Sequence, residues 1–365
     1  MALSTGPSRP RVVLSGFFGR GNCGDEALLQ AQYERLSARY DVVVSVDERG
    51  ACDGFWDRYP YDRCRIVHQA NLGVLAEPDV IGIHVGGGGL PHGFNAAQVV
   101  HARSLGKPAF ITGVDCQAIA AEGAAAMAAY YGLFDLVSVR SAAAHEALAA
   151  VVSGCHRGVD WAVDLSPAGP EPVMRQPTAI LTLREFPVAW ISRGYLGRVS
   201  RLVAALQRRW RRVKLLPFCP EDERFLDKVP PVARLERERH WWDPRRMQRE
   251  IAAAEIVVSL GRLHPLVFAA NVGTPTAFLE PLPDDARWPR SGKAWQLAAE
   301  HGWPCFPDAE AFEDALGRGD GALSLPAGFA AGTRERGRDM VERLETRLVV
   351  AAAAGNKEFG RVQAA

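Results

Sequence analysis

An arginine and a histidine two positions apart, Arg262 and His264, are the residues of this sequence best suited to chemistry on an anion. They follow the apolar, β-branched run Ile256–Leu260, which predicts a buried strand. They precede Pro265, which is favoured in the first turn of a helix, and we expect that helix to end near Gly273. Ligands of open α/β sheets bind at the carboxyl ends of strands, and helix N-termini favour anions. The pattern predicts a phosphate or carboxylate site, although a surface arginine and a core histidine would show the same spacing.

A second arginine, Arg140, has the same setting. The predicted strand Leu136–Val139 ends just before it, and Ser141 can cap the helix that follows. A single arginine at a strand end is usually a structural ion-pair residue. Two arginines in equivalent positions favour anion binding, because a guanidinium group can bind a carboxylate or a phosphate through two hydrogen bonds.

A glycine-rich loop follows the first predicted strand, Arg11–Phe17. Gly19, Gly21 and Gly24 have the spacing G-x-G-x-x-G, and Asp47 lies just past the next strand, near the place of a ribose-binding acid. Dinucleotide binding is therefore one interpretation of this loop. It is not a P-loop, because no Gly-Lys-Ser/Thr sequence follows.

Two carboxylates, Asp25 and Glu26, come at the start of the helix predicted over Asp25–Arg39. They complement the helix dipole there, and a purely structural role would explain them. They would repel a docked pyrophosphate, but they are good acceptors for sugar hydroxyls. The pair therefore argues against a dinucleotide and favours a carbohydrate ligand.

A run of four glycines follows the predicted strand Val80–Val85, and consists of Gly86, Gly87, Gly88 and Gly89. Glycines at a strand end let the backbone approach a ligand closely, and they would equally permit a tight turn beneath a neighbouring helix. His92 comes shortly afterwards and is a candidate polar group at the same mouth.

The chain has 365 residues, 48% of them hydrophobic and 23% charged, with a net charge of +1. This length exceeds what one compact core usually holds, so we expect two domains. The near-zero charge gives no field that would attract nucleic acid or anionic lipid. The seven cysteines form no C-x-x-C pair, so we expect neither a disulfide framework nor a zinc site.

The N-terminal segment lacks the apolar stretch of a secretion signal. The alanine-rich runs at 118–129 and 350–354 are too short or too interrupted to span a membrane. We therefore expect a soluble cytoplasmic protein.

Prolines crowd the stretch between residues 167 and 177, which marks the best domain boundary. Predicted strands alternate with predicted helices on both sides of it. The sequence therefore predicts an α/β protein with two Rossmann-like domains that face each other across a cleft. We expect an N-terminal domain over 1–170 and a C-terminal domain over 176–325. A helical extension follows over 326–365, in which Thr333 would cap a helix over Arg334–Ala353.

Taken together, these stretches resemble the polysaccharide pyruvyl transferase family. The first half carries GFFGRGNCGDEALL, HVGGGGL and VSVRSAAAHEAL, and the second half carries ILTLR, KLLPF with Glu221-Asp222, and VVSLGRLHPLVFAANVGTP. The resemblance implies a GT-B-like fold. It also implies that the enolpyruvyl unit of phosphoenolpyruvate is transferred to two sugar hydroxyls, giving a cyclic ketal and phosphate.

The resemblance further implies roles for single residues. Arg262 and His264 match the family's phosphoenolpyruvate-binding R-x-H motif, with Leu263 between them, and Arg140 matches the arginine that ends a first-domain strand. Many relatives have aspartate where this chain has Ser141. The glycine run and Asp25 match motifs that line the cleft. We expect the substrate-binding set to include the residues Arg140, Arg262, Leu263, Gly86, Gly87, Gly88, Gly89, Asn22, Glu26 and His92.

The expected chemistry needs no metal and no cofactor besides phosphoenolpyruvate as donor substrate. His264 is the candidate acid that protonates the enol methylene carbon, and Asp25 or Glu26 would position or deprotonate the attacking hydroxyl. The C-terminal domain would hold the donor and the N-terminal domain the sugar acceptor. We expect peripheral contact with a lipid-linked acceptor and no binding of nucleic acid. The oligomeric state is left open.

Three alternatives share these features. A glycosyltransferase of GT-B type would use the same two domains to bind a nucleotide sugar. A dinucleotide-dependent enzyme would explain the G-x-G-x-x-G spacing. A catalytically inactive binding homologue would keep the fold without the reaction.

Overall fold

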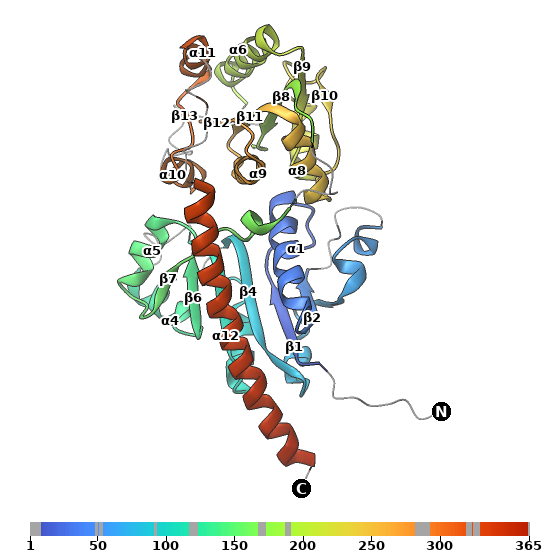
Figure 1. Cartoon of the computed structure of the whole chain (residues 1–365), viewed down its shortest axis with the longest axis vertical. Helices are drawn as coiled ribbons and strands as arrows, with labels where there is room; N and C mark the ends of the chain where they lie inside the picture. Colours follow the sequence, from blue (N-terminus) through green and yellow to red (C-terminus); the bar gives the residue numbers. More distant parts are fainter. Residues whose placement is uncertain are drawn as a thin grey trace. The chain divides into compact units, whose positions relative to one another are not determined.

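A computed structural model describes residues 9–47, 50, 54–90, 93–116, 123–166, 173–186, 191–281, 293–318, 323 and 329–363. The chain divides into two compact units (Figure 1). The first unit comprises Met1–Arg20, Leu28–Trp161 and Glu335–Ala365, and the second comprises Gly21–Ala27 and Ala162–Arg334. The division therefore falls between Trp161 and Ala162, and it groups the short segment Gly21–Ala27 with the second unit.

The first unit contains a 7-stranded sheet in the order β3-β2-β1-β4-β5-β6-β7, in which every pair of neighbours is parallel. Its strands are β1 (Arg11–Ser15), β2 (Asp41–Val46), β3 (Arg65–His68), β4 (Val80–Leu90), β5 (Ala109–Cys116), β6 (Leu136–Val139) and β7 (Cys155–Arg157). The chain order reverses between β1 and β4. Such a reversal is the topological switch point of a doubly wound sheet.

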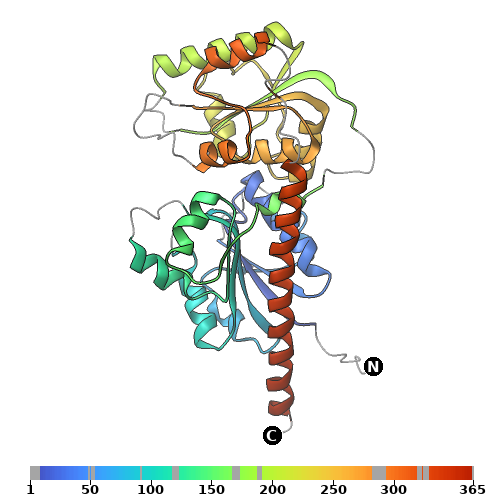
Figure 2. The ribbon, with the colours of Figure 1, turned by 60° about the vertical axis from the view of Figure 1, so that its left-hand side comes forward.

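Helices cover both faces of this sheet (Figure 2). They are α1 (Cys23–Ser37), α2 (Ala96–Ser104), α4 (Ala124–Tyr131), α5 (Ala142–Ala149) and α12 (Phe329–Gln363), with short 3₁₀ turns η1 (Phe55–Asp57), η2 (Tyr61–Arg63), η3 (Leu72–Ala76) and η4 (Trp161–Asp164). Buried side chains of α2, α4 and α5 share one core cluster with the strands. From Glu335 onward α12 belongs to the first unit, where Glu345 binds Arg35 of α1 at 2.6 Å.

The second unit contains a 6-stranded parallel sheet in the order β10-β9-β8-β11-β12-β13. Its strands are β8 (Gln176–Leu183), β9 (Arg212–Leu215), β10 (Glu236–Arg237), β11 (Ala254–Leu260), β12 (Thr276–Leu279) and β13 (Cys305–Phe306). Its helices are α6 (Arg193–Arg209), α7 (Pro220–Leu226), α8 (Pro244–Ala253), α9 (His264–Val272), α10 (Lys293–Glu300) and α11 (Ala309–Arg318). Here the switch point lies between β8 and β11.

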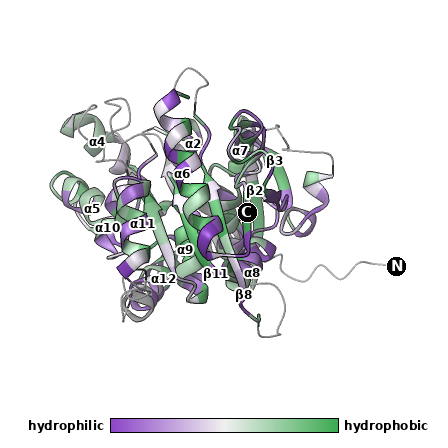
Figure 3. Ribbon diagram, turned by 90° about the horizontal axis from the view of Figure 1, so that it is seen from above, coloured by the Kyte–Doolittle hydropathy of each residue, from purple (hydrophilic) through white to green (hydrophobic). Residues whose placement is uncertain are grey.

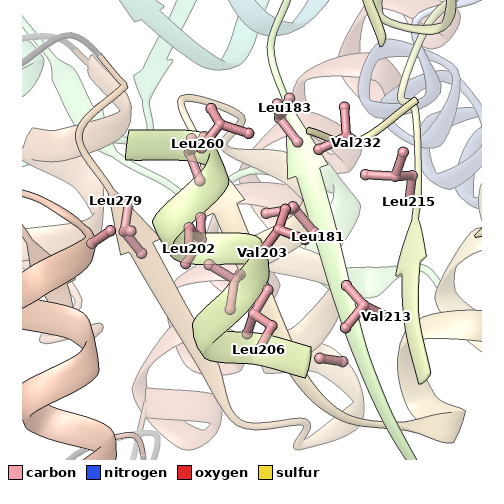
Figure 4. Packing of buried hydrophobic residues seen from close by; sticks show 14 of the residues in the cluster. Leu181, Leu183, Leu202, Val203, Leu206, Val213, Leu215, Val232, Leu260 and Leu279 are labelled. Carbon is pink, nitrogen blue, oxygen red and sulfur yellow. The ribbon is translucent and has the colours of Figure 1, made fainter. Parts of the chain in front are cut away.

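The core of the second unit forms where α6 and α11 pack on the sheet. Leu202, Val203 and Leu206 of α6 lie against strand residues such as Leu181 and Leu260 (Figure 4). The other side of α6 carries charged residues, so the helix alternates between hydrophilic and hydrophobic positions (Figure 3). This amphipathic pattern buries one stripe of the helix and leaves the opposite stripe in water.

The predicted α/β class with two Rossmann-like units is confirmed, since both sheets are parallel and both follow the doubly wound strand order. Two local predictions were wrong. The glycine run is not a loop after a strand, because β4 continues through it to Leu90. Thr333 is not a helix cap, because α12 begins at Phe329 and Thr333 is buried inside it. Among the described helices, none has the length and apolarity that crossing a bilayer requires.

Candidate functional site at the switch point of the second unit

Arg262 and His264 lie where the sequence predicts, between the carboxyl end of β11 and the start of α9. Gly261 adopts a left-handed conformation with φ of 81°, which turns the chain out of the strand. His264 is the first residue of α9, Pro265 follows in its first turn, and Gly273 closes the helix with φ of 70°. The predicted strand, helix start and helix stop are all confirmed.

Buried hydroxyl groups hold this loop in place. Thr182 of β8 donates to the hydroxyl of Ser259 on β11 at 3.0 Å, and Ser259 donates to the carbonyl oxygen of Arg262 at 2.6 Å. Thr182 and Ser259 are both fully buried, where a hydrogen bond is costly to leave unmade. The backbone of Arg262 is therefore fixed by the two strands that flank the switch point.

The guanidinium group of Arg262 is bound by α7. Its Nη2 atom donates to a carboxylate oxygen of Asp222, and also to the sulfur of Cys219 at 2.9 Å. Burial disfavours the positive charge, but the Asp222 carboxylate outweighs this effect and raises the pKa of Arg262 above its ordinary value. Arg262 is therefore a permanently charged cation with a fixed orientation.

Asp222 connects the ends of three neighbouring strands. Its carboxylate accepts hydrogen bonds from the backbone N–H of Glu185 after β8 at 2.9 Å and of Phe218 after β9 at 3.1 Å, besides the bond from Arg262 after β11. The side chain is fully buried. Because these strands are adjacent in the sheet, one carboxylate gathers their carboxyl ends into a single structure.

Cys219 caps α7, and its sulfur accepts the N–H of Asp222 at 3.4 Å. Burial raises the pKa of the Cys219 thiol to about 12, although the charge of Arg262 acts in the opposite direction. Burial and the carboxylates of Asp243, Glu26 and Asp25 likewise raise the pKa of the Cys23 thiol well above its ordinary value. Since the thiolate is the nucleophilic form, neither thiol is suited to nucleophilic catalysis at neutral pH.

A second arginine at this switch point, Arg184, follows β8 directly. Its N–H donates to the carbonyl oxygen of Leu260 at 3.0 Å, which extends the β8–β11 ladder by one hydrogen bond. Burial and the positive charge of Arg262 lower the pKa of Arg184. The two arginines are therefore within electrostatic reach of each other.

The first turn of α1 packs directly on His264. A Cβ atom added to Gly24 would lie 1.9 Å from Nδ1 of His264, so only glycine fits beneath the imidazole ring. Asn22 caps this turn by accepting the N–H of Gly24 at 3.2 Å, and the N–H of Cys23 donates to the carbonyl oxygen of Phe218 at 2.7 Å. The last glycine of the G-x-G-x-x-G pattern thus makes room for a histidine.

Asp25 and Glu26 are nearly buried, with 7% and 2% of their surface exposed. Glu26 accepts the N–H of Gly21 at 3.3 Å, which stabilises the loop that leads into α1. The carboxylate of Asp25 helps to raise the pKa of Arg262, so it lies within electrostatic reach of the guanidinium group. Asp25, Arg262 and His264 therefore belong to one site in the second unit.

Arg140 lies in the first unit, where two carboxylates neutralise its positive charge. Its side chain is 1% exposed, it donates to Asp160, and its Nε atom is 3.6 Å from a carboxylate oxygen of Asp115. Ser141 caps α5 and donates to the other oxygen of Asp115 at 2.9 Å. These contacts match the structural ion-pair interpretation of Arg140, and its role toward a substrate stays a prediction.

Two glycines of the run, Gly86 and Gly87, lie beneath a neighbouring helix, which was one of the two interpretations of the run. A Cβ on Gly86 would lie 2.1 Å from Oε1 of Gln32, and one on Gly87 would lie 2.6 Å from Leu28. Both neighbours belong to α1, so these glycines let the helix approach β4. Contacts of the run with a ligand remain a prediction.

The other predicted site residues have simpler outcomes. Leu263 is buried at the N-cap of α9, and its apolar side chain offers no polar group to a ligand. Asp47 forms an ion pair with Arg20, which occupies the carboxylate that a dinucleotide ribose would need. His92 lies outside the described residues, as does most of the stretch 281–290.

The sequence prediction of the site missed Arg184, Asp222 and Cys219. Arg184 ends the apolar stretch ILTLR, much as Arg140 and Arg262 follow apolar stretches, and that shared position was the available signal. Nothing in the spacing of Asp222 or Cys219 indicates contact with Arg262, which is 40 or more positions away. Only folding brings α7 to the end of β11.

A sequence model of the polysaccharide pyruvyl transferases matches residues 22–282. The match begins at the cap of α1 and includes Asp222, Arg262 and His264, so it contains the whole site described above. This chain belongs to the polysaccharide pyruvyl transferase family. The predicted family is confirmed, and membership supports a general role in pyruvyl transfer. No curated protein matches the chain.

Solved structures support the GT-B-like fold. UDP-N-acetylglucosamine 2-epimerase from Rickettsia bellii is 10% identical, with a TM-score of 0.58, covering 94% of this chain and 96% of that one. MurG from Acinetobacter baumannii is 12% identical, with a TM-score of 0.52 and coverage of 94% and 99%. The spinosyn rhamnosyltransferase SpnG, complexed with thymidine diphosphate, is 13% identical, with a TM-score of 0.53 and coverage of 92% and 99%. At these identities the likeness establishes the fold alone.

Within the described part of the chain, no group of three or more histidine, cysteine or acidic side chains has the arrangement of a metal site. The site instead contains arginines, whose guanidinium groups are suited to binding anions.

Proposed function

We propose that this family member transfers the enolpyruvyl unit of phosphoenolpyruvate to two hydroxyls of a saccharide or sugar-like acceptor. The products would be a cyclic pyruvyl ketal and inorganic phosphate. The observation that carries the proposal is the grouping of Arg262, His264 and Asp25 at the carboxyl end of β11. It places a fixed cation, a titratable imidazole and a carboxylate at one switch point.

The donor fits the charge of this site. Phosphoenolpyruvate carries a carboxylate and a phosphate on adjacent positions, and the second unit offers two guanidinium groups beside the N-terminus of α9. Charge-assisted hydrogen bonds from arginine to such groups are stronger than neutral ones. The N-terminus of α9 adds the favourable end of a helix dipole.

The reaction begins with proton transfer to the methylene carbon of the donor, for which His264 is the general acid. Protonation leaves positive charge on the neighbouring carbon, which the first acceptor hydroxyl attacks while Asp25 accepts the hydroxyl proton. The bond between that carbon and the phosphate oxygen then breaks. The second hydroxyl attacks the same carbon and closes the ketal, and its proton passes to the released phosphate.

The packing of Gly24 against His264 gives this mechanism a physical basis. The imidazole lies on the turn that carries Asp25, so the acid and the base of the first step are held by the same few residues. Asp25 is buried and His264 is partly buried, and removal from water strengthens the interaction of such groups with a charged substrate.

The test is incubation with phosphoenolpyruvate and a panel of sugar acceptors, following phosphate release and product mass. A product that gains the mass of one pyruvyl ketal supports the proposal. Phosphoenolpyruvate should also raise the melting temperature, since it binds only the folded protein. Phosphate release that does not depend on an acceptor would contradict it.

A nucleotide-sugar glycosyltransferase is the second candidate, and the GT-B-like fold favours it. This reaction would need a nucleoside diphosphate in the second unit. Stabilisation by a nucleotide sugar, without any by phosphoenolpyruvate, would select this candidate. The absence of turnover with either donor, together with binding of a saccharide, would select an inactive binding homologue.

A further inference from the structure

We infer that Arg184 is a second anion-binding residue of the donor site, held beside Arg262 by the shared counter-charge of Asp222. The inference rests on the proposed function. It adds to the R-x-H pair a residue from a different strand, on the other side of the switch point.

The backbone register places Arg184 next to the Arg262 loop. Leu183 pairs with Leu260 across the parallel β8–β11 ladder, so the next residues, Arg184 and Gly261, are also opposite each other. A Cβ atom on Gly261 would lie 3.5 Å from the Cβ of Arg184. Both arginines therefore leave adjacent strands at the same level of the sheet.

Asp222 connects these two positions directly. One of its oxygens, Oδ1, accepts both the N–H of Glu185, which follows Arg184, and the Nη2–H of Arg262. Burial is the main cause that lowers the pKa of Arg184, and the positive charge of Arg262 lowers it further, whereas Asp222, Cys219 and Glu185 act in the opposite direction. An anion bound between the two guanidinium groups would relieve the repulsion between them, which favours binding at this position.

The hydrogen bonds of Arg262 show why this arginine alone is insufficient to bind both anionic groups of the donor. Its Nη2 atom already donates to both Asp222 and Cys219. Its Nε atom is buried and has no hydrogen-bond partner within the described part of the chain. A two-nitrogen contact that includes Nη2 would therefore compete with a bond inside the protein. A donor with a carboxylate and a phosphate needs further hydrogen-bond donors, and Arg184 leaves the adjacent strand at the same level of the sheet.

The test compares wild type with Arg184→Gln and Arg184→Lys by steady-state kinetics and thermal shift with phosphoenolpyruvate. Loss of one charge-assisted contact should raise the donor KM about 10- to 100-fold in Arg184→Gln. Arg184→Lys keeps the charge but not the planar group, and should raise it by a smaller factor. The acceptor KM should stay unchanged in both variants.

Inhibition by the product phosphate, and by pyruvate as an analogue of the carboxylate end of the donor, gives a readout that a structural role would not change. The inhibition constant of inorganic phosphate should rise in Arg184→Gln if the residue binds the phosphate end, and that of pyruvate should rise if it binds the carboxylate end. Glu223→Gln is the control for a change of charge near the site, since Glu223 follows Asp222 on α7 but binds Trp241 and Arg239 instead. This control should keep the wild-type donor KM.

The possible failures are distinguishable. Wild type that phosphoenolpyruvate neither stabilises nor reacts with would refute the proposed function itself. Wild type that responds, beside an Arg184→Gln variant with the same donor KM, would refute only the role of Arg184. If Arg184→Gln does not fold, an unchanged donor KM in Arg184→Lys has the same meaning.

Discussion

His264 is the residue whose chemistry matters most, since the proposal assigns it proton delivery. His264→Gln should keep much of the shape and lose the titratable nitrogen. We expect kcat to fall about 100- to 10,000-fold, the usual cost of removing general acid catalysis, with little change in donor KM. Steady-state kinetics with saturating acceptor measures this. A variant with near-normal kcat would return His264 to a packing role at the helix start.

A substitution at Gly24 tests whether the position of the His264 ring matters. Gly24→Ala places a methyl group where the imidazole of His264 now lies. We expect a loss of stability of about 1–3 kcal/mol from overpacking, and a kcat about a hundred-fold lower because the ring is displaced. Gly197→Ala on α6 is the control, since a Cβ there meets nothing within 4 Å. Full activity in Gly24→Ala would show that the position of the ring is not critical.

At the scale of elements, the terminal helix α12 belongs to the fold of the first unit. Leu344 and Leu348 on one side of it are fully buried, whereas the next residue, Val349, is 51% exposed. The helix also binds α1 through Glu345. The extension is therefore a layer of the first unit, because its apolar stripe covers the sheet.

Leu348→Ala should destabilise the protein by about 2–5 kcal/mol, as removal of a fully buried leucine side chain usually does. Val349→Ala should change stability by less than about 0.5 kcal/mol, since it alters an exposed position. Urea unfolding of both variants provides the measurement. Equal effects of the two substitutions would mean that α12 is not packed as described.

At the scale of the whole molecule, a buried histidine links stability to pH. His84 lies inside the first unit, where its Nε2 atom is 2.8 Å from the hydroxyl of Thr112. Burial lowers the pKa of His84 from 6.5 to about 3. Between these values the unfolded chain binds a proton that the folded protein does not, so stability should fall as the pH falls below about 6.5.

The expected slope from this residue is about 1.4 kcal/mol per pH unit. Denaturant unfolding of wild type and His84→Gln between pH 4 and 7 measures it, and the variant should lose that part of the slope. His68→Gln is the matched control, since His68 is an exposed histidine of the same unit. An identical pH dependence in wild type and His84→Gln would contradict the prediction.

The sequence by itself determined the class of fold, the end of β11 and the start of α9. These features depend on local signals, namely the β-branched run before Gly261, Pro265 in the first helical turn and Gly273 at the helix end. Short strands such as β7, β10 and β13 could not be predicted, because two or three residues carry no periodic pattern. Their pairing with neighbouring strands defines them.

Tertiary structure alone decided which groups share the site. It brought Asp222 and Cys219 of α7 to Arg262, and Gly24 of α1 beneath His264, across separations that no spacing rule covers. It also placed two glycines of β4 against α1, where the lack of a side chain lets the helix pack closely. A local motif predicts that a residue lies at the end of its own strand. The charges and hydrogen bonds that tune that residue come from segments that become neighbours only when the sheet forms.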